Sequence, residues 1–315
     1  MHHRCLKKCG GRHFDAMPLK IGSIVIVNWN GKADTLNCLA SLAKLTTYDL
    51  RLTTIVVDNG STDGSVGAIR KKFPRVEVVE TGKNLGFCGG NNVGIRRALE
   101  AGADFVWLLN NDTLVDSGAL SLANVFQDTK IGVAGSKIYF AKGHEYHKDR
   151  YTKDEQGNVI WYAGGLIDWD NMYASHRGVD EVDHGQFDEM AETPFVTGCS
   201  MMVQSKVFER IGFLDEQFYL YLEDVDFCLR AARAGFAIVY VPTSVVWHIN
   251  AGSSAPGSEL HQYYQTRNRI LLGMRYASLR TKIALTREAV RHLWKGKPVV
   301  RRAIMDWILC RYGQM

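Results

Sequence analysis

Short apolar runs alternate with segments of helical periodicity in the first third of the chain. The runs are nearly continuous and rich in β-branched residues, which is typical of strands buried on both faces of a parallel sheet. We expect strands at residues 21–27, 52–57, 76–80 and 105–109, and helices at residues 34–45, 66–72 and 93–101. This alternation predicts an α/β fold with a mostly parallel, Rossmann-like sheet flanked by helices.

The second half of the chain is less regular. Residues 141–192 are rich in His, Asp, Tyr, Trp and Gly and are too polar for a core, so we expect a long insertion that faces the substrate. Residues 218–234 begin with aromatic side chains and become helical, and short strands are expected at 237–241 and 244–248. From Glu259 onward the pattern is helical, which predicts a C-terminal helical extension.

Polar side chains directly follow three of the predicted strands. They are Asn28-Trp29-Asn30, Asp58-Asn59 and Asn110-Asn111-Asp112. In an open α/β sheet, ligands bind outside the carboxyl ends of the strands. The coincidence of these clusters with strand ends is therefore the first indication of a functional site.

Composition narrows the class of protein. The 315 residues are 46% hydrophobic and 23% charged, as in ordinary globular domains, which argues against a disordered, collagen-like or coiled-coil chain. The sequence has no apolar run long enough for a membrane-spanning helix. Seven cysteines without a C-x-x-C pair argue against a zinc knuckle or a disulfide framework, and they favour a reducing cytosol. We expect residues 1–19, which lack the apolar core of a secretory signal, to form a loose leader.

The net charge of +5 is divided unevenly along the chain. Residues 259–315 hold twelve Lys and Arg against three Asp and Glu, whereas the preceding 258 residues hold 26 against 30. Apolar residues such as Trp294 and Trp307 alternate with the basic ones in this tail. A basic amphipathic helix suits an anionic membrane surface, and it equally suits packing on its own domain with a solvated basic face. No nucleic acid is expected as a partner, because no recognised binding module accompanies the charge.

Two polar residues at strand ends are open to two interpretations each. Asp112 closes a buried strand beside two asparagines, which suits an oxygen site for Mg²⁺ or Mn²⁺ that holds a diphosphate. It equally suits the N-cap of a following helix. Asp58 suits either a local turn or a hydrogen bond to a nucleobase or ribose.

Three carboxylates crowd the start of the expected helix near residue 223. Glu223, Asp224 and Asp226 stand within four residues, and like charges this close disfavour each other unless a cation, helix N-terminus or substrate offsets them. They suit a plain helix start or a general base for a hydroxyl nucleophile. His248 ends an apolar run, and its position in the sequence does not separate a structural from a catalytic histidine.

Other nucleotide-binding classes lack their motifs. The first predicted strand ends in Asn28-Trp29-Asn30-Gly31 rather than G-x-G-x-x-G, which excludes a dinucleotide-binding dehydrogenase, and a P-loop motif is also absent from the sequence. A nucleotidyltransferase normally needs a glycine- and arginine-rich loop after its first strand, and residues 28–32 offer none. That class is retained only as a weaker alternative.

Six sequence blocks together identify a family. They are VIVNWNG (25–31), VVDNGSTDGS (56–65), NLGFCGGNNVGI (84–95), WLLNNDT (107–113), FLDEQFYLYLEDVDFCLRAARAGF (213–236) and VWH (246–248). In this order they resemble the inverting glycosyltransferases of family 2, within them the bacterial rhamnosyltransferase-like branch. The resemblance covers about residues 20–275. It implies a GT-A fold at 20–258, with a nucleotide-binding part at about 20–115, an acceptor part at about 116–258, and the basic tail at 259–315 beyond it.

The resemblance also implies positions for the functional residues. Donor-binding residues would be Asn28, Asn30, Asp58, Asn59, Asn84, Gly86, Asn92, Asn110 and Asn111. Asp112 and His248 would be metal ligands, although Asn110 replaces the first acid of the family's D-x-D. Asp224 would be the catalytic base and Glu223 would orient it or the acceptor. The acceptor side would include Asp226, Trp247, Arg267 and Asn268.

The implied activity is an inverting, Mg²⁺- or Mn²⁺-assisted sugar transfer in bacterial cell-surface polysaccharide synthesis. The expected donor is dTDP-L-rhamnose, with UDP-hexoses next, and the expected acceptor is a glycan or lipid-linked oligosaccharide. The expected location is the cytoplasm, either with the basic tail packed on its own domain or with the tail at the inner face of the cytoplasmic membrane. A catalytically silent sugar-nucleotide or glycan-binding protein of the same fold is the main alternative.

Overall fold

The computed structural model describes residues 20–46, 50–249 and 257–315. The expected leader, residues 1–19, lies outside this range. The strands of the described residues are β1 (Lys20–Asn28), β2 (Leu50–Asp58), β3 (Glu77–Glu80), β4 (Phe105–Leu109), β5 (Thr113–Val115), β6 (Ile131–Phe140), β7 (Ile160–Tyr162), β8 (Gly165–Asp168), β9 (Tyr173–His176), β10 (Ala191–Glu192), β11 (Ser200–Gln204) and β12 (Ala237–His248).

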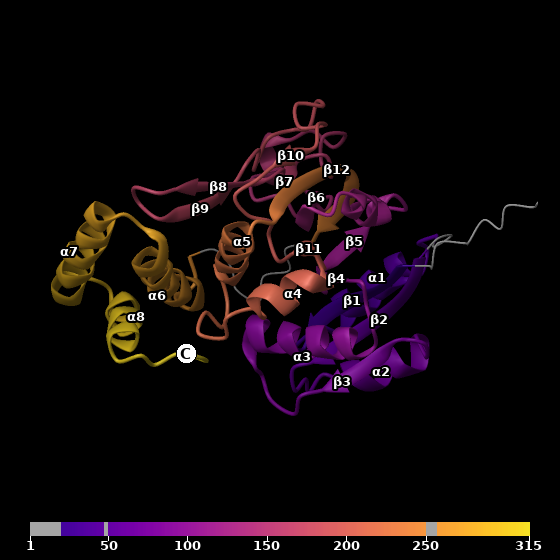
Figure 1. The fold of residues 1–315 in the computed structure, drawn as a ribbon, viewed down its shortest axis with the longest axis horizontal. Helices are drawn as coiled ribbons and strands as arrows, with labels where there is room; N and C mark the ends of the chain where they lie inside the picture. The colour runs from indigo at the N-terminus through magenta and orange to yellow at the C-terminus, as the bar shows by residue number, and fades with distance from the viewer. Residues whose placement is uncertain (1–19, 47–49, 250–256) are drawn as a thin grey trace, which may run out of the picture.

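The helices of the same residues lie around and beyond the sheet (Figure 1). The α-helices are α1 (Lys32–Leu42), α2 (Ser65–Lys72), α3 (Gly86–Glu100), α4 (Ser205–Ile211), α5 (Glu223–Arg233), α6 (Glu259–Tyr276), α7 (Leu279–Lys295) and α8 (Pro298–Ile308). Two 3₁₀ segments, η1 (Ala119–Gln127) and η2 (Lys148–Arg150), complete the set.

A ten-stranded sheet forms the centre of the described fold, with the main order β10-β12-β6-β11-β4-β1-β2-β3. Along this path only β11 and β10 run against the other strands, so the sheet is mostly parallel as predicted. The first and second strands end together, because Asn28 pairs with Asp58 in register. The polar clusters that follow these strands therefore lie at one edge of the sheet, as their sequence positions indicate.

Helix α3 shows why the glycine-rich segment after β3 is helical rather than a loop. Gly94 lies over Val25 and Val57, where a Cβ atom would come within 2.3 Å and 3.1 Å of their methyl groups. A Cβ atom on Gly90 would likewise come within 2.9 Å of a methyl group of Val27. The glycines allow the helix backbone to approach β1 and β2 closely, a tertiary gain that outweighs their low helix propensity.

Two expectations for the second half change. The strands expected at 237–241 and 244–248 form one strand, β12, whose pairing with β6 shifts register between Val241 and Val245. Such a bulge interrupts the sequence pattern without ending the strand. The residues after Asp112 form strand β5 rather than a helix, which excludes the helix-cap interpretation of Asp112.

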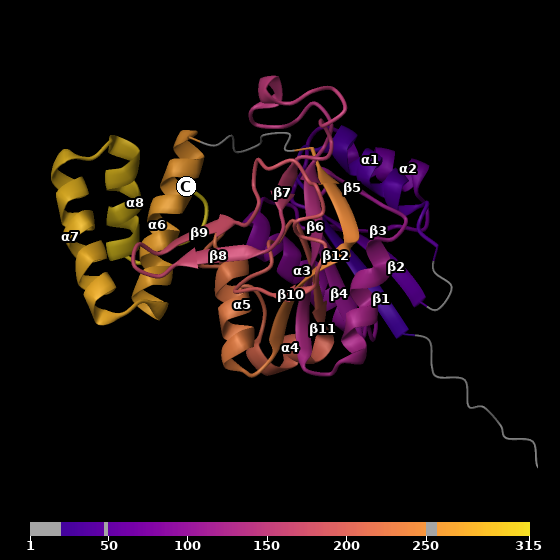
Figure 2. The same cartoon turned by 90° about the horizontal axis from the view of Figure 1, so that it is seen from above.

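The basic tail, expected to be helical, folds into the three helices α6, α7 and α8. In Figures 1 and 2, α6 lies next to α5, and α7 and α8 pack on the far side of α6. Buried residues Leu285 and Ala289 of α7 and Ala303 and Ile304 of α8 face this packing. In the described part of the chain, no helix has both the length and the apolar character needed to cross a membrane.

Candidate active site

A cavity of about 760 Å³ opens at the edge of the sheet where β1, β2 and β4 end. The loop before α5, the N-terminal half of α6 and the 141–192 segment supply its other walls. Ten of the residues expected from the sequence line it: Asn30, Asn59, Asn84, Gly86, Asn110, Asn111, Asp112, Glu223, Asp224 and His248. Seven others, Asn28, Asp58, Asn92, Asp226, Trp247, Arg267 and Asn268, do not.

Asn28 and Asp58 form a buried hydrogen-bonded pair behind the cavity wall. Asn28 Nδ2 donates to Asp58 Oδ1 at 2.7 Å, and the Ser61 N–H donates to Asp58 Oδ2 at 2.8 Å. Thr35 Oγ1 donates to Asn28 Oδ1 at 2.8 Å. Because both side chains are buried and bonded to protein groups, they hold the ends of β1 and β2 together.

The cavity wall on this side is built by backbone of unusual conformation. Asn30 adopts a left-handed φ of 52°, and its Oδ1 accepts a hydrogen bond from the Thr62 N–H at 2.8 Å. Asn59 Nδ2 donates to the Gly86 carbonyl at 2.9 Å. Gly86 has a φ of 74°, and a Cβ there would lie 2.6 Å from the Tyr219 ring, so both its conformation and its contact require glycine. This wall therefore connects the donor-side loops to the loop that carries Tyr219.

Asp112 and His248 meet across two paired strands. β5 pairs with the end of β12, which sets His248 opposite Thr113, and Asp112 Oδ1 lies 3.2 Å from His248 Nε2. The imidazole is buried, and its Nδ1 has no hydrogen-bond partner among the described residues. This Nδ1 is not the ring nitrogen that lies beside Asp112, so the contact that could include a cation is the one at Nε2.

The Asp112–His248 pair fits a divalent cation. Two ligands at right angles around Mg²⁺, each at about 2.1 Å, lie about 3 Å apart. The oxygen and nitrogen of the pair match this separation at 3.2 Å. Within the described residues, no group of three or more His, Cys, Asp or Glu side chains could hold a metal ion. Any cation held by this pair would therefore need further ligands besides His, Cys, Asp and Glu side chains of the described residues.

Trp161 and His176 form a cluster of tilted rings beside His248. The Trp161 ring lies 4.6 Å from the His248 ring and 4.4 Å from the His176 ring, centroid to centroid. Burial lowers the pKa of His176 to about 4, and its Nδ1 lies 3.0 Å from the Trp161 carbonyl oxygen. His176 is therefore neutral at physiological pH. Trp161 and His176 line the cavity and were missed as individual residues, although the sequence expectation for 141–192 covers them.

Glu223 and Asp224 begin α5 and also line the cavity. Asp224 is partly exposed to the cavity, and its Oδ2 accepts a hydrogen bond from the Gly198 N–H at 3.0 Å. Burial raises the pKa of Asp224 despite this bond. Burial, reinforced by the charge of Asp224, raises the pKa of Glu223 well above its usual value, and Glu223 Oε2 has no hydrogen-bond partner among the described residues. The buried Glu223 therefore keeps its proton to a higher pH than an exposed glutamate does.

Three left-handed residues make the turn into α5. Tyr219, Tyr221 and Leu222 have φ values of 63°, 70° and 67°, which bulky side chains rarely adopt. Arg267 and Asn268 of α6 hold this loop by its carbonyls. Arg267 donates to the carbonyl oxygens of Gln217 and Phe218 at 2.9 Å and 2.7 Å.

Asn268 holds the same loop, and we call Arg267 and Asn268 together the clamp. Asn268 Nδ2 donates to the carbonyl oxygens of Phe218, Leu220 and Tyr221 at 2.8–2.9 Å. Both clamp side chains, Arg267 and Asn268, are fully buried. Such bonds in a buried site offset the strain of the loop and fix where α5 begins. Arg267 and Asn268 therefore act on the position of Glu223 and Asp224 from behind the cavity.

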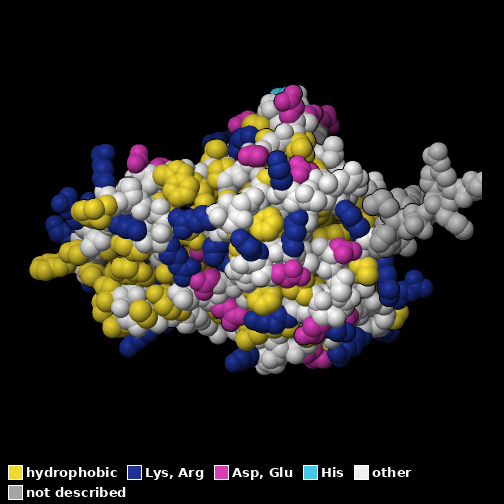
Figure 3. All heavy atoms as spheres, in the orientation of Figure 1, with side chains coloured by type: hydrophobic (Ala, Val, Ile, Leu, Met, Phe, Trp, Pro, Cys, Tyr) yellow, Lys and Arg dark blue, Asp and Glu magenta, His cyan; other side chains and the backbone are white. Residues whose placement is uncertain are grey.

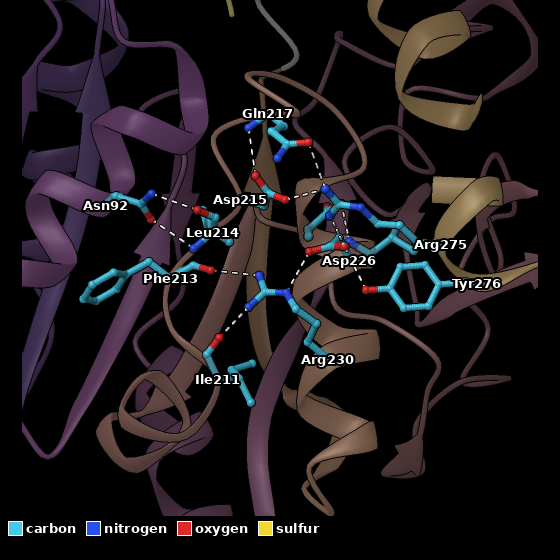
Figure 4. A network of polar contacts seen from close by, with 12 residues as sticks. Asn92, Ile211, Phe213, Leu214, Asp215, Gln217, Asp226, Arg230, Arg275 and Tyr276 are labelled. Atoms are coloured by element: carbon cyan, nitrogen blue, oxygen red, sulfur yellow. Dashed lines mark hydrogen bonds and ion pairs between the residues drawn. The ribbon is translucent and has the colours of Figure 1, made fainter. Parts of the chain in front are cut away.

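Asp226 belongs to a hydrogen-bonded network between α5 and α6 (Figure 4). Its Oδ1 accepts from Arg275 at 2.9 Å and from Tyr276 at 2.8 Å, and its Oδ2 accepts from Arg230 at 2.8 Å. Figure 4 also shows Asn92, whose Nδ2 donates to the Leu214 carbonyl at 2.9 Å. These polar groups hold α3, α5 and α6 in place and leave Asp226 outside the cavity.

Trp247 is likewise a packing residue. Its indole N–H donates to the Gly157 carbonyl at 2.9 Å, and its ring stacks on Tyr139 at 6.2 Å. Other aromatic residues do reach the cavity, among them Tyr219 and Tyr221 from the loop before α5 and His261 and Tyr264 from α6. Tyr219 and Tyr264 stack with centroids 5.4 Å apart. Tyr264 lies one helical turn before Arg267 and Asn268 on α6, and it was not among the site residues expected from the sequence.

Known proteins share this architecture. A low-salt glycan biosynthesis hexosyltransferase of Haloferax volcanii is 27% identical over 69% of this chain and 63% of its own. An N-acetylglucosaminyl-diphospho-decaprenol L-rhamnosyltransferase of Mycobacterium tuberculosis is 28% identical over 72% of this chain and 76% of its own. A dTDP-rhamnosyl transferase of Shigella flexneri is 24% identical over 79% and 78%.

A solved structure and a family match point to the same class of protein as these relatives. The crystal structure of GalNAc-T7 with UDP, GalNAc and Mn²⁺ superposes with a TM-score of 0.65 at 16% identity, over 92% of this chain and 55% of that one. Residues 22–273 match the family described as glycosyltransferase like family 2. The chain belongs to glycosyltransferase family 2, with the GT-A fold and a rhamnosyltransferase-like sequence.

Proposed function

We propose that this chain transfers a sugar from a nucleoside diphosphate donor to a hydroxyl group of a glycan or lipid-linked acceptor, with inversion at the sugar. The observation that carries this proposal is the shared cavity. It has the Asp112–His248 pair on one wall and Asp224 on another. A donor diphosphate could thus bind at the Asp112–His248 pair while an acceptor hydroxyl lies near Asp224 in the same cavity.

The donor end would use Asp112 and His248 as ligands of a Mg²⁺ or Mn²⁺ ion. When bound, such a cation stabilises the negative charge that develops on a departing diphosphate. Asn110 and Asn111 add neutral oxygen and nitrogen groups to the same wall. Because Asn110 stands where the family has an acid, Asp112 would supply the carboxylate charge of this loop.

The acceptor end would use Asp224 as the general base. Its carboxylate accepts the hydroxyl proton while the hydroxyl oxygen attacks the anomeric carbon, and the bond from that carbon to the diphosphate oxygen breaks. General-base help of this kind contributes about 10²- to 10⁴-fold. A raised pKa suits this task, because a base is most effective when its pKa lies near the operating pH. One carboxylate suffices for this single displacement, which supports inversion.

The relatives support rhamnose as the transferred sugar. Two of them are named rhamnosyltransferases, one of these for a dTDP donor and the other for a diphospho-decaprenol acceptor. We therefore propose dTDP-L-rhamnose as donor, with UDP-hexoses next. The proposed setting is bacterial cell-surface polysaccharide synthesis at the inner face of the cytoplasmic membrane.

A thermal-shift comparison of sugar nucleotides tests the donor site. With Mg²⁺ or Mn²⁺ present, dTDP-L-rhamnose at about 100 times its Kd should stabilise the protein by about 2.7 kcal/mol, and chelator should abolish the shift. Asp112→Ala should lose the metal-dependent part, whereas the exposed Asp154→Asn control should keep it. A larger thermal shift with a UDP-hexose than with dTDP-L-rhamnose would make the UDP-hexose the proposed donor. A wild-type shift that survives excess chelator would reject the metal.

A further inference from the structure

The outer face of the C-terminal helices exposes an unusual apolar stripe. On α7, the exposed fractions of Leu279, Ile283, Val290 and Trp294 are 75%, 45%, 52% and 81%. At 100° per residue these four positions fall within an arc of about 60° on the helix. The buried residues Thr281, Leu285 and Ala289 lie on the opposite side. The stripe is therefore not part of the packing of α7 on its neighbours in the described chain.

Helix α8 continues the exposed apolar surface. Met305 and Ile308 of α8 and its C-cap residue Leu309 are 43–49% exposed and are spaced i, i+3 and i+4. Figure 3 shows hydrophobic side chains gathered at the end of the molecule that α7 and α8 form, next to Lys and Arg side chains. We call the seven residues Leu279, Ile283, Val290, Trp294, Met305, Ile308 and Leu309 the apolar face.

Basic side chains flank the apolar face. Arg280, Arg287 and Arg291 are exposed and lie beside the stripe, at about 80–120° on the same helical projection. The two acids of α7 and α8 are engaged within the protein: Glu288 with Arg269 at 2.9 Å, and Asp306 with the Tyr263 hydroxyl at 2.7 Å. The field of this surface is therefore positive, and it is not neutralised by its own acids.

We propose that the apolar face and its flanking arginines dock this protein on an anionic lipid bilayer. Charge complementarity favours a membrane over a second copy of the chain, because two copies would bring their arginines together. Exposed Trp and aliphatic residues enter the headgroup region, while basic residues attract anionic lipids. The surface is suited to lying on a bilayer rather than spanning it.

Helix α6 links this surface to the cavity. Leu260, His261 and Tyr264 of α6 line the cavity, and α7 and α8 pack on the same helix. Docking would hold the α6 wall of the cavity toward the membrane, where the sugar of a lipid-linked acceptor lies. This inference deepens the proposed function and rests on it for the acceptor, whereas docking itself is measurable without a donor.

Flotation of the full chain with vesicles tests the docking. Vesicles of phosphatidylcholine with 30% phosphatidylglycerol should carry the protein upward, and pure phosphatidylcholine or high salt should reduce binding. Each basic residue near an anionic surface changes the partition coefficient about fivefold, so Arg287→Gln with Arg291→Gln should lower it by about 25-fold. The matched pair Lys71→Gln with Lys72→Gln, exposed on α2, should leave it unchanged.

A second pair of variants tests the apolar contribution. Leu279→Ser with Trp294→Ser should lower binding at least tenfold, whereas Met190→Ser, 55% exposed near β10, should have no effect. Circular dichroism and sedimentation accompany each variant. The proposal is overturned if the wild type does not float with anionic vesicles. It is also overturned if neither the Arg287/Arg291 variant nor the Leu279/Trp294 variant weakens flotation. A solution dimer that Trp294→Ser dissociates, without vesicle binding, would show a self-association surface instead.

Discussion

At the scale of single residues, two adjacent acids have different surroundings. Asp224 is partly exposed to the cavity and bonded to a backbone N–H, whereas Glu223 is 4% exposed and its Oε2 has no hydrogen-bond partner in the described chain. A buried acid of this kind stays protonated to higher pH than usual. Its neutral form leaves Asp224 to carry the negative charge. This division of charge supports Asp224 rather than Glu223 as the base.

The raised pKa of Glu223 predicts how stability depends on pH. The folded state keeps the proton at a pH where the unfolded state has released it, so the free energy of unfolding falls as pH rises from the ordinary Glu value through the raised one. Glu223→Gln should match the wild type near pH 4.5 and exceed it increasingly toward pH 8. Urea unfolding at several pH values measures this difference.

The exposed Glu209→Gln is the control for that series. It should follow the wild type at every pH, because Glu209 is solvated in both states. A constant difference between Glu223→Gln and wild type across this range would contradict the protonated Glu223.

At the scale of elements, α6 positions the loop before α5. Arg267 and Asn268 bind four carbonyls of residues 217–221, while Arg275 and Tyr276 bind Asp226 within α5. The tail of the sequence thus begins with a helix that is part of the site, which agrees with the family match extending to residue 273. Only α7 and α8 lie beyond it.

The clamp predicts a contrast between two arginines on one helix. Arg267→Lys loses the planar fork that reaches several buried carbonyls, so it should cost about 2–4 kcal/mol and lower kcat more than tenfold with donor Kd little changed. Arg269→Lys loses a two-bond ion pair with Glu288 and a bond to the Asn171 carbonyl, so it should also cost stability, but Arg269 does not bond to the loop before α5 and kcat should be retained. Unfolding and steady-state kinetics measure both.

Equal kcat values for these two folded variants would contradict a positioning function of the clamp. A loss of stability alone, with kcat unchanged below the melting temperature, would assign Arg267 to packing.

At the scale of the whole molecule, the parallel half of the sheet could be predicted because its signals are local. Each of β1, β2 and β4 is one apolar run followed by a polar cluster. The long-range hydrogen bonds that hold the elements together could not be predicted in this way. Asn92 bonds to Leu214, 122 residues away, and Arg267 bonds to Phe218 across 49. Neither partner is indicated by spacing, so the sequence did not distinguish residues in the cavity from residues that hold it.

The tail shows the same limit at a larger scale. Its basic and apolar pattern predicted amphipathic helices, yet α7 has apolar residues on two sides, one buried and one exposed. A count of charges and apolar positions cannot separate these sides. The packing of α7 and α8 on α6 determines which residues stay available for a membrane.

The transfer reaction itself tests the central claim most directly. Asp224→Asn preserves the shape of the side chain and removes the base, so transfer from dTDP-L-rhamnose should fall by about 10²- to 10⁴-fold while donor Kd stays within about threefold. Asp154→Asn, a solvated acid in the 141–192 segment, should transfer at the wild-type rate. Near-normal turnover of Asp224→Asn, with donor bound as in the wild type, would contradict the assignment of Asp224 as the base.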